Sequence, residues 1–413
     1  MKKRRLKKNA VVILIMLLLF IFLVIGLFLL KPWEKGSSKE TKDTKQINEK
    51  YNSKDYYTEF ASMKKDTKIY KYENKKYIDA GTIYKDAKIS LEESKNKYFK
   101  IKNSDYYVYY DSFTKSEEKQ KDKSYERWAP YNENIEGENL TLSQDNKKVL
   151  TIKEKLSLPI YRKTEDKNYV LYKEELYEIK KDEGKIQEKQ NSDTSLASAV
   201  AVLNYHFFYD PEKGEKCDQI ICHTKKQFIS HLNYLKENNY TTLTAEDLKL
   251  FLKKEINVPK TSLVITIDDG YLAKLGVELL NEYKMYGTLF LITAWYSPND
   301  FKSEYVKTES HSHDMHNTGV CPTGQGGAIQ CWPDDKILSD LKTSQEVLGG
   351  SKVFCYPFYE YNNHSIELLK QAGFEMAFVG GKKKAVPGVD LFQIPRYVIG
   401  SDTTLEDFKR KIN

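Results

Sequence analysis

Two short segments of the chain combine residue types that can hold a metal ion and activate water. Residues 265–270 form an apolar, β-branched run that ends in Asp268, Asp269 and Gly270, and residues 311–316 contain three of the seven histidines. Carboxylate and imidazole are ligands of catalytic zinc sites, which keep three protein ligands and an open position for water. A second carboxylate beside the ligands could act as a base toward that water. Together the segments predict a metal-dependent hydrolase.

Spacing alone leaves the ligand set open. Neighbouring side chains of a strand point to opposite faces, but at a strand end Asp268 and Asp269 can both reach one pocket. His313 and His316 would share one face of a helix, whereas a loop could present His311 with His316 instead. The alternative for the aspartates is that they only cap the helix that follows.

The elements that must position these segments alternate between strands and helices from residue 197 onward. We expect strands over residues 200–205, 262–267, 288–293 and 353–356, and helices over residues 225–238, 248–252, 275–284, 334–348 and 365–372. This alternation predicts a parallel α/β domain, either an open sheet or a barrel. In both architectures the chemistry lies at the carboxyl ends of the strands, where Asp268 and Asp269 stand.

These motifs resemble those of a known family. Residues 266–270 resemble the first motif of the polysaccharide deacetylases, carbohydrate esterase family 4 with its NodB-homology domain. The His-Ser-x-x-x-His pattern of residues 311–316 is similar to the metal motif of the family's biofilm poly-N-acetylglucosamine deacetylase branch. Weaker similarities to other family motifs lie at residues 204–206, 355–358 and 394–396. The resemblance covers residues 197–413 and implies a distorted (β/α) barrel.

The resemblance also implies roles for individual residues. Asp269, His311 and His316 would bind one divalent metal ion, with zinc as the expected ion. Asp268 would be the general base. His206 is the candidate acid, because no histidine follows His364 to supply the acid that most members place near the C-terminus.

The expected substrate contacts come from several further residues. The resemblance implies Tyr356, Pro357, Phe358 and Arg396 as substrate-binding residues, and Cys355 stands near the position of the arginine that the third motif usually carries. Trp295 and Trp332 flank the site in sequence. They could stack on a sugar ring, and the alternative is that they only pack against the protein.

A long apolar segment near the N-terminus predicts membrane attachment. Residues 10–30 carry no charge and as a helix would span about 31 Å, close to the thickness of the hydrocarbon core. The preceding residues 1–9 include six basic side chains, which account for most of the net charge of +7. We therefore expect a retained signal anchor, with residues 1–9 cytoplasmic and the rest of the chain extracellular at the cell membrane. A cleaved signal peptide is the alternative. The remaining charge gives no basic patch for nucleic acid.

The region between the anchor and the α/β domain is rich in tyrosine and short strand-like alternations. We expect a polar linker over residues 31–50, one or two small β-rich modules over residues 51–181, SH3-like barrels being one form, and a second polar linker over residues 182–196. Residues 69–71 and 160–162 suggest a weak repeat. The tyrosines could bind sugars, or they could fill small β cores.

The five cysteines fall into two close pairs and one remainder. In an extracellular chain we expect the disulfides Cys217–Cys222 and Cys321–Cys331, with Cys355 as a buried thiol. A second metal site from Cys217, Cys222 and His223 is an alternative that lacks a fourth ligand nearby.

These observations lead to one main hypothesis and two alternatives. The main one is a membrane-anchored deacetylase acting on N-acetylglucosamine in a cell-surface polysaccharide. The alternatives are a peptidoglycan N-acetylglucosamine deacetylase and a catalytically silent glycan-binding surface protein. The sequence gives no indication of protein partners.

Overall fold

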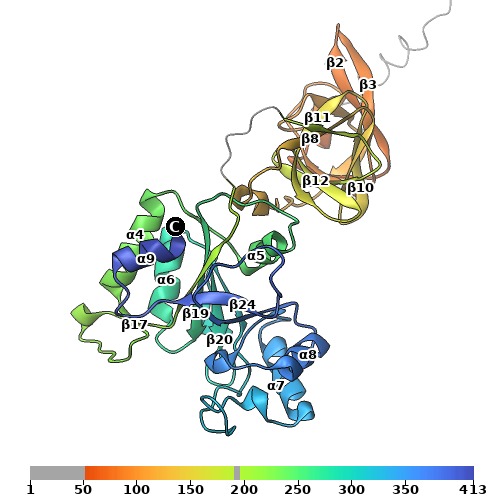
Figure 1. Ribbon diagram of the computed structural model, residues 1–413. Coiled ribbons are helices and arrows are strands. Elements are labelled where there is room, and N and C mark those ends of the chain that lie inside the picture. The colour runs from red at the N-terminus through yellow and green to blue at the C-terminus, as the bar shows by residue number, and fades with distance from the viewer. Residues whose placement is uncertain (1–51, 190–195) are drawn as a thin grey trace, which may run out of the picture.

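A computed structural model describes residues 52–189 and 196–413 as a β-rich region followed by an α/β domain (Figure 1). Within these described ranges, no helix is both long enough and apolar enough to cross a membrane. The anchor expected over residues 10–30 and the linker expected over residues 31–50 lie outside the described residues.

The β-rich region begins with the short helix α3 and continues as antiparallel strands. Its elements are α3 (Ser53–Tyr56), β1 (Phe60–Met63), β2 (Thr67–Glu73), β3 (Lys76–Ile83), β4 (Lys88–Ser90), β5 (Tyr98–Lys100), β6 (Tyr106–Tyr109), β7 (Phe113–Lys115), η1 (Ser124–Arg127), β8 (Glu133–Gly137), β9 (Leu140–Gln144), β10 (Lys147–Ile152), β11 (Leu156–Lys163), β12 (Lys167–Tyr172), β13 (Glu175–Lys180) and β14 (Lys185–Glu188). Eleven strands form one sheet in the order β14-β8-β11-β12-β13-β9-β10-β3-β2-β6-β5, and β4-β1-β7 form a second.

The sequence repeat corresponds to two similar hairpins within this region. Ile69 lies on β2, which pairs with β3, and Ile160 lies on β11, which pairs with β12. Both isoleucines are fully buried, and the strand register shifts directly after each of them. The two halves are joined by the β3–β10 pairing and share one apolar core, so they form a single packed unit rather than two separate barrels.

Part of the segment expected to be a polar linker, residues 182–196, is a β-strand. Strand β14 lies inside it and pairs antiparallel with β8 through four residue pairs. All four residues of β14 are exposed, so the strand is held by backbone hydrogen bonds at a sheet edge and buries no side chain. A prediction from apolar pattern cannot detect such a strand.

The α/β domain contains the expected alternation of strands and helices. Its elements are β15 (Ala201–Tyr205), β16 (Phe207–Tyr209), η2 (Pro211–Lys213), β17 (Cys222–Thr224), α4 (Lys225–Glu237), β18 (Thr241–Thr242), α5 (Ala245–Leu252), β19 (Ser262–Asp269), α6 (Lys274–Tyr283), β20 (Gly287–Leu291), η3 (Pro298–Phe301), β21 (Val306–Ser310), η4 (Ala328–Gln330), α7 (Asp334–Val347), β22 (Val353–Cys355), η5 (Pro357–Tyr359), α8 (Asn363–Gln371), β23 (Met376–Gly381), β24 (Ile394–Val398) and α9 (Leu405–Ile412).

The strands of this domain close into a seven-stranded parallel barrel. The sheet order β15-β24-β23-β22-β21-β20-β19 is completed by pairing of β19 with β15. The barrel is distorted, because β21 and β22 share a single residue pair, Ser310 with Phe354, whereas β20 and β21 share five. The expected fold class of the C-terminal domain is therefore confirmed as a distorted barrel.

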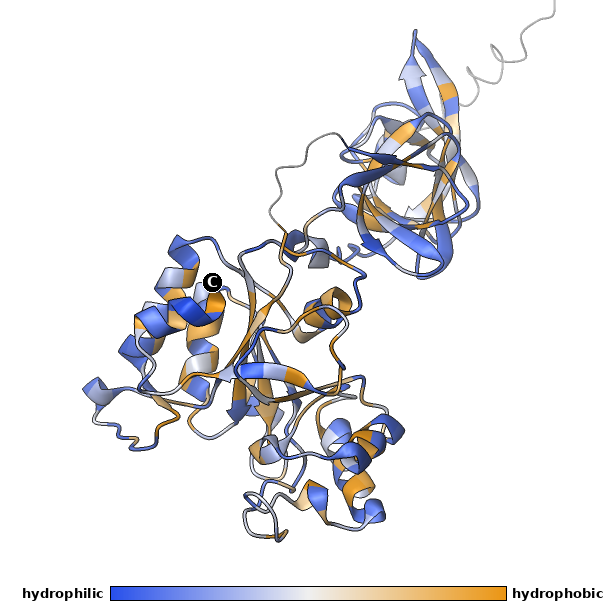
Figure 2. Cartoon of the chain, viewed as in Figure 1, coloured by the Kyte–Doolittle hydropathy of each residue, from blue (hydrophilic) through white to orange (hydrophobic). Residues whose placement is uncertain are grey.

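Alternation along β19 decides which side chains enter the barrel. Leu263, Ile265 and Ile267 belong to the core that includes the outer helices α4, α6 and α9. Val264 lies between them and belongs to the other core, with Phe290 and Phe378. Asp268 continues the inward series of Val264. Figure 2 shows hydrophobic residues concentrated in the barrel strands and hydrophilic residues on the outward helix faces.

The β-rich region contacts the barrel domain through a small set of charged and aromatic side chains. Arg127 Nε lies 2.6 Å from Asp247 Oδ2, and Trp128 Nε1 donates to Asp247 Oδ1 at 2.7 Å. Arg162 pairs with Glu255 at 2.6 Å. Trp128 also joins the apolar core of the barrel domain. These contacts fix the β-rich region against the barrel domain in the described structure.

Candidate functional site

Four barrel strands deliver their chemically active residues to one end of the barrel. His206 directly follows β15, Asp268 and Asp269 end β19, His311 directly follows β21, and Cys355 ends β22. These are the carboxyl ends of parallel strands, where active sites of α/β barrels form. Apart from the half-buried His316 in the loop after His311, the residues of the expected ligand set and the two acid–base candidates are buried.

Asp268 is held by the guanidinium of Arg396, a residue of strand β24. Arg396 donates from Nη1 to Oδ1 at 2.7 Å and from Nη2 to Oδ2 at 2.8 Å, and both side chains are almost completely buried. Burial alone would raise the pKa of Asp268, but the charge and hydrogen bonds of Arg396 hold the pKa well below its usual range. Asp268 is therefore a fixed, ionised carboxylate.

Arg396 was expected to bind the substrate, but its side chain is buried and contacts other protein groups. Its side chain is 0% exposed, and Nη1 also donates to Thr266 Oγ1 at 3.0 Å. Nη2 lies 2.9 Å from the sulfur of Cys355, and burial raises the pKa of that thiol. Arg396 therefore contacts both the carboxylate of Asp268 and the sulfur of Cys355 from strand β24.

Asp269 turns toward the same pocket because its backbone leaves the strand conformation. Its φ angle is +77°, in the left-handed region that a non-glycine residue rarely adopts. Such a conformation costs about 1–3 kcal/mol and persists where the surroundings fix it. Gly270 follows with φ +102°, and a Cβ there would lie 2.7 Å from atoms of Leu291 and Tyr296. The Asp-Asp-Gly sequence therefore gives two adjacent carboxylates a common direction.

Asp269, His311 and His316 have the geometry of a metal site. Asp269 Oδ1 lies 3.2 Å from His311 Nε2 and 3.3 Å from His316 Nε2. Ligand atoms about 2.0–2.1 Å from a tetrahedral ion are separated by about 3.3 Å, so these two separations fit a small divalent ion. Asp269 Oδ1 is buried without a hydrogen-bond partner, which fits an oxygen reserved for a cation.

The two imidazoles are prepared for this role in different ways. His311 Nδ1 donates to the carbonyl oxygen of Cys355 at 2.8 Å, which leaves the Nε2 lone pair free to point toward Asp269. Burial lowers the pKa of His316 to about 4, so its ring is neutral at physiological pH. Its ring packs on Phe358, with ring centroids 4.2 Å apart.

The loop that presents these histidines is ordered by Asp340, a residue of α7. Its carboxylate accepts the backbone N–H groups of His313 and Asp314, both at 2.7 Å. Ser312 has φ +73°, which turns the loop between the two ligands. Sequence reasoning did not identify Asp340, although an aspartate on the buried face of a helix, beside Ile337 and Leu341, is the signal that could have found it.

His206 faces Asp268 across the pocket. Its Nε2 lies 3.9 Å from Asp268 Oδ2, and its Nδ1 is buried without a partner. Burial lowers the pKa of His206, while the charge of Asp268 acts in the opposite direction. His206 and Asp268 therefore lie close enough together to act on one substrate.

The remaining predicted residues divide into those at the pocket rim and those inside the fold. Trp295 is 48% exposed and meets His316 edge-on, with centroids 5.9 Å apart, and Phe358 is half-buried on the other side of His316. Trp332 is half-buried, with the Lys336 ammonium 3.3 Å from its ring centre. Tyr356 and Pro357 are buried, so their side chains are not exposed to a substrate in this structure.

Both expected disulfides are present, Cys217–Cys222 in the loop before β17 and Cys321–Cys331 in the loop before α7. Cys217 and Cys222 are thereby unavailable as ligands, so the alternative metal site with His223 is wrong. Cys355 is a buried free thiol, as expected.

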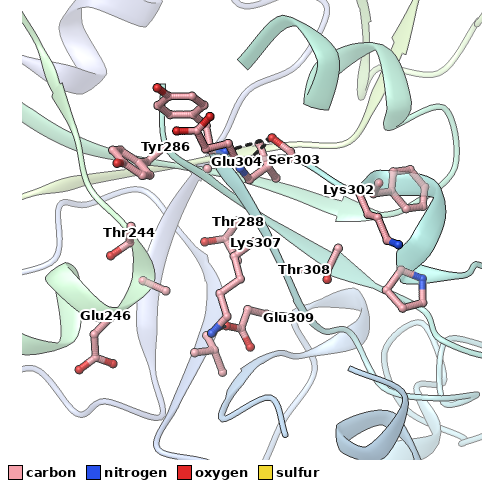
Figure 3. Close-up of a pocket in the computed structure, with 17 residues that line it drawn as sticks. Thr244, Glu246, Tyr286, Thr288, Lys302, Ser303, Glu304, Lys307, Thr308 and Glu309 are labelled. Atoms are coloured by element: carbon pink, nitrogen blue, oxygen red, sulfur yellow. Dashed lines mark hydrogen bonds and ion pairs between the residues drawn. The ribbon is translucent and has the colours of Figure 1, made fainter. Parts of the chain in front are cut away.

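A separate hollow of about 590 Å³ lies against strands β20 and β21 and the segment that connects them (Figure 3). Thr288, Lys307 and Glu309 of strands β20 and β21 line it. The connection between these strands contains only the short helix η3, so no long helix covers this part of the barrel. The hollow contains none of the predicted site residues and lies away from the carboxyl ends of the strands.

Comparison with known proteins places the site in a family. A model of the polysaccharide deacetylase family matches residues 255–377. The chain is 26% identical over 253 residues to a poly-beta-1,6-N-acetyl-D-glucosamine N-deacetylase of Staphylococcus aureus (strain MRSA252), a match covering 55% of this chain and 85% of the relative.

Two solved structures are similar to the chain over about half its length. A de-N-acetylase from Aggregatibacter actinomycetemcomitans is 21% identical with a TM-score of 0.44 and covers 52% of this chain and 99% of its own. IcaB from Ammonifex degensii is 18% identical with a TM-score of 0.41 and covers 51% and 95%. From the family match and the sequence relatives, we conclude that the C-terminal half of this chain is a polysaccharide deacetylase domain and that the chain is a hydrolase.

Proposed function

We propose that this chain is a metal-dependent deacetylase that hydrolyses the N-acetyl groups of N-acetylglucosamine in a poly-β-1,6-N-acetylglucosamine-like cell-surface polysaccharide. The observation that carries the proposal is the triad Asp269, His311 and His316, whose ligand atoms lie 3.2–3.3 Å from the shared aspartate oxygen. The substrate is inferred from the name of the staphylococcal relative.

A divalent ion bound by this triad, zinc being the expected one, would supply Lewis-acid polarisation of the acetyl carbonyl and of a water molecule. The protein's part is to hold three ligands in place and leave one side open. Phe358 and Trp295 both pack against the His316 ring, with centroid distances of 4.2 Å and 5.9 Å. The backbone N–H of Tyr356 donates to the Phe378 carbonyl oxygen at 3.2 Å, so the N–H of Phe358 is the candidate donor to the developing oxyanion.

Asp268 would accept the proton of the attacking water. Because Arg396 fixes both carboxylate oxygens, the base does not need to reorient during the reaction. Oδ2 is the oxygen on the side of His206. When Asp268 takes up a proton, it no longer neutralises the buried charge of Arg396. The proton must therefore pass to another group.

His206 would protonate the leaving amine, because an amide does not expel a free amide anion. Its Nε2 lies 3.9 Å from Asp268 Oδ2, so the two groups are close enough to act side by side on one substrate amide and its attacking water. Burial lowers the pKa of His206 and the charge of Asp268 opposes that shift, so the role of acid depends on Asp268 remaining beside the imidazole.

Acetate release tests the proposal. Full chain with added zinc should release acetate from β-1,6-linked N-acetylglucosamine oligomers, and the Asp268→Asn variant should lose about a hundred- to ten-thousandfold of that rate. Because loss of the Asp268 charge leaves Arg396 buried without its partner, the fold of this variant is checked by its melting temperature and zinc content. The matched control is Asp314→Asn, because Asp314 is an exposed aspartate in the loop that carries His311 and His316.

Substrate choice is tested in the same assay. Peptidoglycan fragments in place of the oligomers should be hydrolysed at least about tenfold more slowly. A higher rate on peptidoglycan would replace the substrate assignment. No acetate from either glycan, with zinc bound at one ion per chain, would favour a silent glycan-binding protein.

We also propose that residues 10–30 anchor the chain in the cell membrane with residues 1–9 in the cytoplasm and the two described regions outside. The uncharged 21-residue stretch and its basic flank support this orientation. Protease added to intact cells should remove a tag fused to the C-terminus and spare a tag fused to the N-terminus. The reverse pattern would contradict the orientation.

A further inference from the structure

The tyrosines of the first half of the β-rich region lie on the outside of its sheet. On β6, Tyr106 and Val108 are buried, whereas Tyr107 and Tyr109 point to the other face. On β5, Phe99 is buried and Tyr98 is not. We call the outward set of Tyr70, Tyr72, Tyr77, Tyr98, Tyr107 and Tyr109 the tyrosine face. None of the six belongs to the apolar core of the described β-rich region.

The rings of the tyrosine face hold one another in place. Tyr77 and Tyr98 are stacked with centroids 3.7 Å apart, and Tyr107 and Tyr72 contact Tyr77 at 5.3 Å and 4.9 Å. Tyr70 and Tyr109 approach Tyr98 edge-on at 5.3 Å and 5.2 Å. Because β3 carries Tyr77 and β5 carries Tyr98 with two strands between them, the sheet must curl to bring these rings together. The face is therefore rigid before any ligand arrives, which lowers the entropic cost of binding.

Beside these rings lies a hollow of about 430 Å³. Tyr72, Tyr77, Tyr98 and Tyr107 form one part of its wall, and the other lining residues are all polar, including Glu92, Glu93, Asn96 and Lys100. Lys100 pairs with Glu92 at 3.4 Å, and Asn96 donates to the Tyr77 hydroxyl at 3.3 Å.

We propose that the tyrosine face and its hollow form a second binding site, separate from the deacetylase site, for a chain of β-linked hexosamines. A pyranose ring presents a flat patch of C–H groups edged by hydroxyl and amino or acetamido groups. Aromatic faces match the patch, and carboxylates, amide and phenol hydroxyls match the edge. A protein partner is the less favoured occupant, because interfaces between proteins usually need an apolar centre and no aliphatic side chain lines this hollow.

The position of the tyrosine face in the chain suggests how polymer binding there would assist the deacetylase site. The β2–β3 hairpin lies at the end of the β-rich region that is remote from the barrel (Figure 1). The contacts Arg127–Asp247 and Arg162–Glu255 fix that region to the catalytic domain. A polymer bound at the tyrosine face would stay close to the active site between successive reactions, so its effective concentration there would rise. Only the choice of hexosamine as the sugar rests on the proposed function.

Binding of the full chain to immobilised hexosamine oligomers tests the site, with acetylated and fully deacetylated oligomers as separate arms. Tyr72→Ala is the first variant, since this side chain is 52% exposed and its loss should not unfold the sheet. Tyr77→Ala and the conservative Tyr77→Phe follow. We expect each lost ring to weaken binding about three- to tenfold in at least one arm, and Tyr77→Phe to bind nearly as well as the parent chain.

Tyr84→Ala is the matched control, because Tyr84 lies in the same region, half-buried, and contacts Thr151 and Lys148 instead of the tyrosine face. Unchanged binding in the Tyr72 and Tyr77 variants, or an equal loss in Tyr84→Ala, would overturn the second site. Acetate release measured in parallel separates the two proposals. If the chain releases acetate and its glycan binding does not depend on the tyrosines, only the second site is rejected. Tyrosine-dependent binding without acetate release removes only the deacetylase assignment.

Discussion

Two groups of buried histidines lie in the same catalytic domain, and they differ in what surrounds them. His223 of β17 and His231 of α4 have ring centroids 6.4 Å apart and lie among Tyr205, Phe228 and Phe408. The barrel-mouth group, His206, His311 and His316, faces Asp268 and Asp269. Burial lowers the pKa of His223, His231 and His316 alike, so a lowered pKa does not distinguish the two groups, whereas, despite burial, interactions with Cys355 and Asp269 raise the pKa of His311.

The difference lies in the carboxylates and in where the ring nitrogens point. In the barrel-mouth group two imidazole nitrogens converge on one oxygen that has no hydrogen-bond partner. In the core group His231 Nδ1 lies 3.0 Å from the Tyr205 hydroxyl and its ring stacks on Phe408 at 4.2 Å, contacts that hold packing together. Convergence on a shared anionic atom therefore identifies a site, whereas histidine burial alone identifies a core.

The largest expected difference between the two histidine groups is the effect of substitution on zinc binding and acetate release. His311→Ala should abolish stoichiometric zinc binding and lower acetate release at least about a thousandfold, because loss of a ligand removes several kcal/mol of transition-state stabilisation. Zinc content is measured by elemental analysis after gel filtration. His231→Leu is the control and should keep one ion per chain. Equal loss of zinc in both variants would show that the comparison is wrong.

A smaller loss is expected where a barrel-mouth histidine does not bind metal. His206→Asn should lower acetate release about a hundred- to ten-thousandfold, the usual contribution of a general acid. Zinc content should stay at one ion per chain, since His206 is not in the triad of ligand atoms. Loss of zinc in this variant would instead make His206 a ligand.

The Arg396→Lys variant tests whether Asp268 acts as the base. Lysine cannot make the two parallel hydrogen bonds to Asp268, so kcat/KM should fall about ten- to a hundredfold. Because the charge and hydrogen bonds of Arg396 lower the pKa of Asp268, weakening them should raise that pKa and move the acidic limb of the pH–rate profile to higher pH. Arg162→Lys, at the contact with the β-rich region, is the control. An unmoved acidic limb would contradict Asp268 as the titrating base.

The sequence predicts the first motif and its strand because local pattern and chemistry agree there. Strand β24 shows the opposite case. Its Pro395 and Arg396 argue against a central strand, and no strand was expected there. Arg396 is tolerated inside the barrel only because Asp268, 128 residues earlier, neutralises it. A pairing over such a separation is not visible in one sequence, so neither the strand nor the position of Arg396 could be predicted.

Strand β21 was missed for a related reason. Of its five residues Val306, Lys307, Thr308, Glu309 and Ser310, only the first is strongly apolar. Glu309 and Ser310 are nevertheless buried, because the hydroxyls of Ser351 and Ser344 bond to them. Apolar periodicity detects strands that bury carbon, and it does not detect strands whose buried polar atoms find partners elsewhere in the fold.

The core histidines should affect stability rather than activity. Their folded-state pKa values of about 4 lie below the ordinary value of about 6.5. Between these pH values the unfolded chain binds protons that the folded chain does not, so their contribution to stability is complete above about pH 6.5 and is lost as the pH falls toward 4. Each histidine should cost about 2 kcal/mol of unfolding free energy between pH 7.5 and 5.0.

Urea unfolding of the zinc-loaded chain at both pH values measures this loss. His231→Leu should show a smaller pH-dependent decrease than the parent by about 2 kcal/mol, whatever its stability at pH 7.5. An identical decrease in parent and variant would mean that His231 is protonated in the folded chain, and the contrast between core and site would have to rest on geometry alone.

The smallest effect is expected at His364, which belongs to neither group. Its Nε2 lies 2.7 Å from Asp334 Oδ1, but the two side chains are 62% and 58% exposed, so water screens the pair. Exposed pairs contribute about 0–1 kcal/mol, and Asp334 gains a separate benefit from its place in the first turn of α7. His364→Gln should therefore change the unfolding free energy by less than about 0.5 kcal/mol at pH 6 and leave acetate release and zinc content unaltered. A loss above about 1 kcal/mol would mean that an exposed histidine can stabilise this domain as much as a buried one, and the distinction between surface and core would fail at its simplest point.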